Sequence, residues 1–282
     1  MMDFKIVVDS SADIRSIPYS VPFGVAPLKI ITSQKEYCDD GELDVHEMLD
    51  DLEKYKGRSG SACPNTEDWK KEFYGFDNIF CVTITSGLSG SYNSAHIAAN
   101  EYMNDNLKAK VFVIDSLSTG PEIAMVVEKL AQLIENGNSF EDIKEQILSY
   151  KNTTHLIFAL ESMHNLANNG RINHVVAKFA GALGIRVIGK ASLQGTLEMT
   201  DRSRGSKKMI ADIIKNMSSN GYAGGRVRIH HCENPSAASE LKERILKACP
   251  KADIDIAQTG ALCSFYAERG GLIIGYTGKS KT

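Results

Sequence analysis

The sequence lacks the long apolar runs, the paired cysteines and the surplus of basic residues that mark several large classes of protein. No stretch approaches the roughly 20 apolar residues that a membrane-spanning helix needs. The first residues, MMDFKIVVDSS, lead directly into a strand-like pattern and carry no apolar secretory core. The six cysteines form no CxxC pair, as expected of reduced thiols. We therefore expect a cytoplasmic protein without integral membrane association.

Charge and motif content exclude two further classes. The chain has 32 Lys and Arg residues against 35 Asp and Glu residues, with no long basic block, so it has no electrostatic footprint for nucleic acid. No GxGxxG follows a strand-like run, which argues against dinucleotide binding. With 282 residues and 43% apolar content, the chain is long enough for one large domain or two ordinary ones.

Short apolar runs alternate with longer amphipathic ones in the first half of the chain. Strand-like runs cover 4–9, 24–31, 78–84 and 109–115, and helix-like patterns cover 45–56, 66–74, 91–103, 121–136 and 139–150. This alternation is typical of βαβ units. It predicts a three-layer α/β/α domain with a mainly parallel sheet.

The pattern of alternating strand-like and helix-like segments changes near Lys151. Strand-like runs then cover 155–160, 186–193, 195–201, 227–232, 252–258 and 271–276, with helices predicted at 175–183, 206–216 and 235–248. The Gln194-Gly195 pair between two strands favours a hairpin, and hence a mixed sheet. We therefore predict two α/β domains, an N-terminal one over 1–151 and a C-terminal one over 152–282.

Hydroxyl side chains gather directly after three predicted strands, in the segments 9–13, 85–91 and 115–120. Because ligands bind beyond the carboxyl ends of strands in open α/β sheets, these segments are candidates for one binding rim. Helix capping is the competing role, and we expect it for Asp13 and Ser118. One cap needs one hydroxyl, however, and the segment TSGLSGS supplies four.

The segment 83–95, TITSGLSGSYNSA, is therefore the strongest candidate for a site. Gly87 and Gly90 allow close backbone approach, and the first free N–H groups of the following helix face the same point. Ser61 precedes the predicted cap at Asn65 or Thr66 and lies in extended backbone, so its hydroxyl is also available. An anion or a polar head group fits this chemistry.

The succession DSSAD, SACPN, TSGLSGSYNSA, IDS, LANNGRI and ALGIRVIGK resembles the DegV family, whose patterns include DSxxD, TSQP, SSGLSGTYQSA and GGRI. The resemblance extends in order over essentially the whole chain. It implies a non-catalytic protein that binds a long-chain fatty acid in a cleft between two α/β domains, with no other cofactor and no metal. It also implies that the protein presents this acid to a fatty acid kinase partner.

The resemblance implies a role for individual residues. Ser61 and Ser89 would hold the fatty acid carboxylate, and Ser91 would assist them. The third head-group residue of the family is a histidine in an HxGxG segment, and Tyr266 stands at that position here. A tyrosine donates a hydrogen bond but cannot carry the charge of an imidazolium. The remaining assignments are cleft support by Ser86, Gly90 and Arg171, and partner contact by Arg204 or Arg202.

An acyl tail pocket is expected in the second domain. A tail of about 14 methylenes would gain roughly 11 kcal/mol on burial, enough for micromolar binding after the cost of association. For any one residue proposed for this pocket, ordinary core is the more common role, by about three to one. The candidate residues are Phe158, Leu160, Leu166, Phe179, Leu183 and Ile188.

Two alternative functions remain open from the sequence. A serine hydrolase would use Ser89 in a strand-to-helix turn, although Ser91 stands where the second glycine of GxSxG belongs. Its triad would add Asp115 and one of His155, His164, His174 and His231. A binder of small phosphate esters would use the same loops. A metal site at 230–232 is disfavoured, because neighbouring strand residues point to opposite faces.

Overall fold

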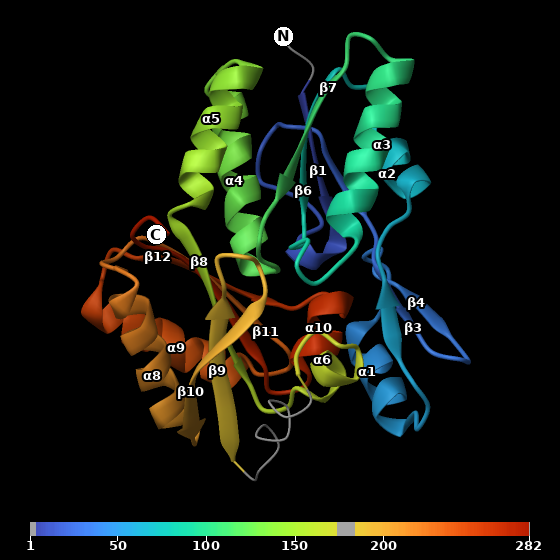
Figure 1. Cartoon of the computed structure of the whole chain (residues 1–282). Coiled ribbons are helices and arrows are strands. Elements are labelled where there is room, and N and C mark those ends of the chain that lie inside the picture. Colours follow the sequence, from blue (N-terminus) through green and yellow to red (C-terminus); the bar gives the residue numbers. More distant parts are fainter. Residues whose placement is uncertain (1–3, 174–183, 282) are drawn as a thin grey trace.

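The computed structural model describes residues 4–173 and 184–281, which contain two large sheets and one small one (Figure 1). The first large sheet has the order β2-β1-β6-β7, and every neighbouring pair is parallel. Its strands are β1 (Phe4–Asp9), β2 (Phe23–Ala26), β6 (Asn78–Thr83) and β7 (Lys110–Asp115). The predicted parallel sheet is confirmed.

The second large sheet has the order β10-β9-β8-β13-β11-β12 and is mixed, since only β11 and β12 run parallel. Its strands are β8 (Thr154–Leu160), β9 (Ile185–Ala191), β10 (Leu197–Arg204), β11 (Arg226–His231), β12 (Asp253–Gln258) and β13 (Leu272–Thr277). The small antiparallel sheet joins β3 (Lys29–Ile31) to β4 (Glu36–Cys38) and β5 (Gly60–Ala62).

Helices cover both faces of each large sheet. On the first sheet, α2 (Thr66–Phe73) and α3 (Ser91–Asp105) pack on one face, and α4 (Pro121–Glu135) and α5 (Phe140–Lys151) lie on the other (Figure 1). On the second sheet, α8 (Ser206–Ser219) and α9 (Pro235–Ala248) cover the face away from α4. Three short helices, α1 (Val45–Lys54), α6 (His164–Asn168) and α10 (Ala261–Ala267), and the 3-10 turn η1 (Ser10–Ala12) complete the described elements.

Helix α4 lies between the two large sheets. It contacts β1 and β6 of the first sheet and β8, β11 and β13 of the second. Ten of its 15 residues are buried, which explains why its apolar pattern is denser than that of a helix with one solvated face. Even Glu122 is only 1% exposed, and its carboxylate accepts hydrogen bonds from Ser118, Thr154 and Lys281. The two halves of the chain therefore share one apolar core through this helix.

The structure corrects several sequence predictions. The predicted strand 24–31 is two strands in different sheets, because Pro27 cannot donate a ladder hydrogen bond. Ser118 does not cap α4, whose cap is Gly120, and Asp13 ends η1 in a left-handed conformation instead of beginning a helix. The predicted helix 175–183 lies outside the described residues. Helices α6 and α10 and strands β4 and β5 were not predicted.

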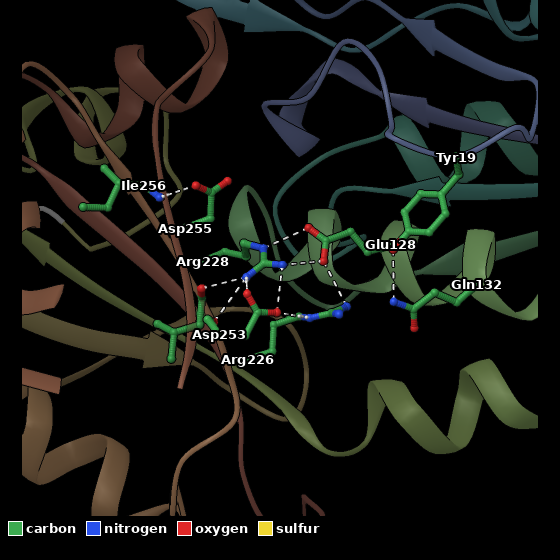
Figure 2. A network of polar contacts seen from close by, with 9 residues as sticks. Tyr19, Glu128, Gln132, Arg226, Arg228, Asp253, Asp255 and Ile256 are labelled. Atoms are coloured by element: carbon green, nitrogen blue, oxygen red, sulfur yellow. Dashed lines mark hydrogen bonds and ion pairs between the residues drawn. The ribbon is translucent and has the colours of Figure 1, made fainter. Parts of the chain in front are cut away.

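A network of ion pairs holds α4 against the second sheet (Figure 2). Arg228 of β11 donates to Glu128 of α4 through Nε at 2.9 Å and Nη2 at 2.8 Å. Arg226 donates to the same carboxylate at 2.9 Å, and Asp253 of β12 accepts from both arginines. The Glu128 and Arg228 side chains are 19% and 12% exposed, so solvent screens this pair only weakly.

Replacing Glu128 tests this network. Glu128→Gln leaves two partly buried guanidinium groups with one carboxylate fewer, so we expect the free energy of unfolding to fall by about 1–2 kcal/mol. Urea unfolding at 0.05 M and 1 M NaCl measures the loss, most of which should remain at the higher salt concentration. Glu141→Gln, in the exposed pair with Lys144, is the control and should change stability little. Equal effects of the two substitutions would contradict the proposed role of Glu128.

Candidate functional site

A narrow apolar cavity lies between the segments that follow β2, β6 and β7 of the first sheet, the second sheet and α10. Its volume is about 80 Å³, well below the range of open small-molecule pockets, which indicates a thin channel. Of the 17 described residues that line it, twelve are apolar: Leu28, Ile84, Leu88, Leu156, Phe158, Leu160, Leu166, Leu197, Leu262, Cys263, Ala267 and Ile273.

The remaining five lining residues are polar. Thr119 contacts the Cys263 sulfur, and four side chains from distant parts of the chain meet at the cavity: Ser61 on β5, Ser89 in the turn before α3, Arg171 after α6 and Tyr266 on α10. The hydroxyls of Ser61 and Tyr266 are hydrogen-bonded to each other at 2.7 Å. The Arg171 guanidinium lies 5.8 Å from the centre of the Tyr266 ring and donates through Nε to the Leu88 carbonyl oxygen. Two hydroxyl donors and one cation can thus face a single oxygen-bearing group.

The other residues predicted for the site lie elsewhere. Ser91 is fully buried beneath the cavity wall, and its hydroxyl donates to Asp9 at 2.6 Å. Ser86 is exposed and does not line the cavity, and Gly90 is the N-cap residue of α3. Arg202 and Arg204 are exposed on β10, away from the cavity lining.

The predicted tail residues divide between two faces of the second sheet. Phe158, Leu160 and Leu166 line the cavity. Ile188 packs instead with α8 and α9 in the core on the opposite face, so its placement was predicted wrongly. Phe179 and Leu183 lie outside the described residues.

Asp9 organises the turn that carries Ser89. This fully buried carboxylate accepts from the Ile84 backbone N–H at 2.8 Å and from the hydroxyls of Ser91 and Ser11. Burial raises its pKa from the ordinary 3.8 to about 6, although these hydrogen bonds act in the opposite direction. Asp9 therefore joins the end of β1 to both ends of the turn that links β6 to α3, and it fixes that turn.

Helix α10 is positioned by two aspartates of the N-terminal half. Asp13 accepts from the Gly260 backbone N–H at 2.9 Å, and Asp39 accepts from the N–H groups of Ala261 and Leu262. Carboxylates at a helix N-terminus satisfy its free donors. This docking sets the position of Tyr266 opposite Ser61. The sequence offered no signal for it, because the partners are more than 200 residues apart.

The histidines in the described part of the chain do not support the hydrolase hypothesis. His155 bonds to the Lys279 carbonyl, His164 to Asn168 and His231 to the Asn234 N–H, and none of them lines the cavity. His174 lies outside the described residues. Asp115 accepts from the backbone N–H groups of Ser86 and Leu117. Within residues 4–173 and 184–281, no cluster of three or more His, Cys, Asp or Glu side chains could hold a metal ion.

No helix in the described ranges has both the length and the apolar character needed to cross a bilayer. The six cysteines, all within those ranges, are free thiols.

Comparison with known proteins matches the chain over nearly its full length. The sequence model of the DegV family, described as an uncharacterised protein family, matches residues 3–278. A DegV domain-containing protein of Streptococcus pneumoniae (strain ATCC BAA-255 / R6) is 43% identical over 278 residues, which are 98% of this chain and 99% of that protein.

Two solved structures resemble this one closely. A DegV family protein from Eubacterium eligens, loaded with heptadecanoic acid, has a TM-score of 0.96 and 46% identity and covers 98% of this chain and 100% of its own. The Streptococcus pneumoniae Fatty Acid Kinase (Fak) B3 protein, loaded with linoleic acid, has a TM-score of 0.97 and 43% identity, with coverage of 99% and 100%. These matches confirm the predicted fold class.

Replacing Asp9 should change how stability depends on pH. The unfolded chain ionises this carboxyl near pH 3.8 and the folded protein near pH 6, so the stability present below pH 3.8 is lost as the pH rises through 6. A difference of about two in pKa corresponds to about 3 kcal/mol. Asp9→Asn keeps an acceptor for Ile84 and removes this titration. Urea unfolding at pH 4 and pH 7 should show the wild type losing up to about 3 kcal/mol relative to the variant. Parallel pH profiles would contradict the assignment.

Proposed function

The chain belongs to the DegV family, and from this membership we propose that it binds one long-chain fatty acid in the cavity between its two large sheets. The protein acts as a carrier and performs no chemistry on the acid. The bound fatty acid is its ligand, and the proposal requires no cofactor or metal. The hydrolase and phosphate-ester alternatives are not favoured.

The observation that best supports this proposal is a thin apolar channel with polar groups gathered on its wall. Twelve apolar residues line it, and Ser61, Ser89, Arg171 and Tyr266 contribute hydroxyls and a cation. A hydrocarbon chain gains free energy from leaving water at about 0.8 kcal/mol per methylene, whereas a phosphate ester has no such tail to bury. A carboxylate is the head group that needs few donors and tolerates partial burial.

We assign the carboxylate contacts to Ser61, Ser89 and Tyr266. The Ser61–Tyr266 hydrogen bond holds two of these hydroxyls side by side, and all three can donate to the acid once that bond is exchanged for contacts with the carboxylate. Arg171 adds positive charge, and Ser91 supports the Ser89 turn through Asp9. Gly90 supports the cleft through close packing, since a Cβ there would lie 3.3 Å from the Cys63 sulfur.

The proposal extends to the setting in which the protein works. The similar Fak B3 protein is named for a fatty acid kinase, so we propose a kinase partner here and place its contact at Arg202 and Arg204 on β10. A division into domains 1–151 and 152–282 follows the change of sheet between α5 and β8. Free cysteines fit a reducing cytoplasm, which we propose as the location.

Mass spectrometry tests the function directly. We expect protein purified without added lipid to carry one fatty acid of C14 to C18, seen as a mass difference between native and denatured spectra. Delipidated protein should take up added oleate with micromolar or tighter affinity. Steady release of p-nitrophenol from short esters would instead support the hydrolase. A ligand-free protein that fails to take up oleate would overturn the proposal.

Hydroxyl removal tests the head-group assignment. Ser61→Ala and Tyr266→Phe should each weaken oleate binding by roughly 3- to 10-fold, because each removes one hydrogen bond to the carboxylate. Binding of the methyl ester of oleate, which carries no charge, should change less. Ser59→Ala and Tyr74→Phe are matched controls outside the cavity lining and should bind as the wild type does. Unchanged affinity in both test variants, measured by fluorescence competition, would refute the assignment.

A further inference from the structure

Phe158 occupies the middle of one wall of the cavity. On β8, Leu156, Phe158 and Leu160 point to the cavity, while Ile157 and Ala159 pack on the other face of the sheet. Leu160 ends β8 on the side of α6, whose Asn165 donates to the Phe265 carbonyl oxygen of α10. Leu156 lies at the other end of the strand, near Thr154, which bonds to Glu122 at the start of α4. The side chain at 158 is therefore beside the middle of any chain whose head group is held at Tyr266.

Because Gly189 on the neighbouring strand has no side chain, the Phe158 ring can pack against that strand. The two residues are directly opposite each other in the antiparallel β8–β9 pair, so they share the cavity face. A Cβ at Gly189 would overlap Phe158 Cζ and would lie 2.7 Å from its Cε2. The ring thus occupies the space that a side chain at 189 would fill.

The neighbours of Gly189 on the cavity face leave the ring no equivalent second position. Val187 and Ala191 of β9 carry side chains on this face, and Ile273 of β13 is opposite Phe158 on its other flank. Side chains in a sheet normally stand roughly perpendicular to it. A ring displaced from Gly189 would therefore move toward the channel, which is already narrow.

We propose that Gly189 determines the acyl chains this protein accepts, by keeping the Phe158 ring against β9 and so leaving the middle of the channel wide enough for a cis-unsaturated chain. A cis double bond bends a chain near its centre and widens the path it needs, whereas a saturated chain can pass extended. Gly189 is a positioning residue, because it acts on the ligand only through the ring. This inference rests on the proposed function.

Gly189→Ala should therefore narrow the channel selectively. The added methyl group should push the Phe158 ring into the channel. We expect this to lower the affinity for oleate by about tenfold, because the bent chain needs a wider channel, and to leave the affinity for stearate unchanged. The measurement is competition of each acid against a fluorescent fatty acid on delipidated protein. Thermal unfolding of the same samples records whether the variant folds.

A double-mutant cycle isolates the role of the ring. The same Cβ would also lie 2.6 Å from the Glu198 carbonyl oxygen on β10, so the single variant alone could act by distorting that strand. Adding Phe158→Leu removes the ring and leaves the Glu198 contact unchanged. We expect the double variant to regain the wild-type ratio of oleate to stearate affinity.

The outcomes separate this inference from the proposed function. A wild type that binds neither acid overturns both. A wild type that binds both acids, with a Gly189→Ala variant that loses them equally or is not rescued by Phe158→Leu, overturns the inference alone. If Gly189→Ala does not fold, the single variant Phe158→Leu provides the test. Removing the ring should improve the binding of stearate that carries a bulky 9-anthroyloxy group at mid-chain. Unchanged affinity for that probe would refute the role of the ring.

Discussion

The burial of α4 between two sheets is the constraint on which the rest of the structure depends. A helix with ten buried residues in 15 cannot be solvated on either side, so the two halves of the chain must close over it. The ion pairs of Glu128 with Arg226 and Arg228 fix its outer part, and the buried hydrogen bonds of Glu122 fix its first turn. The cavity opens before the N-terminus of this helix, where Thr119 faces Leu156 and Phe158 of the second sheet.

The polar groups at the cavity depend on a second set of long-range contacts. Asp13 and Asp39 dock α10 against the N-terminal half, and Asp9 fixes the turn that carries Ser89. Each of these carboxylates is buried and accepts at least one backbone N–H as well as a side-chain hydrogen bond, which makes the arrangement rigid at some electrostatic cost. The site is therefore built on fixed elements from both halves of the chain.

Local signals in the sequence predicted much of this fold and less of the site. The starts of three helices were predicted within a residue from Pro121, Pro235 and the Ser139 cap. The turn that carries Ser89 was recognised from its content of hydroxyl residues and glycines. Helix α10 was missed because all but one of its seven residues are buried, so it has no amphipathic period. The pairing of Ser61 with Tyr266 and the packing of Phe158 on Gly189 depend on strand register and docking, which no local pattern encodes.

The residues of the cavity wall couple the stability of the protein to its ligand. Leu28, Ile84, Phe158 and Leu262 line the channel and also belong to the largest apolar core of the molecule. A bound ligand fills the channel inside that core, and a ligand that binds only the folded form raises the free energy of unfolding with the logarithm of its concentration. Protein without a bound ligand would unfold more often and would be degraded sooner by proteases. The amount of this protein would then follow the amount of lipid offered to it, with no dedicated sensor required.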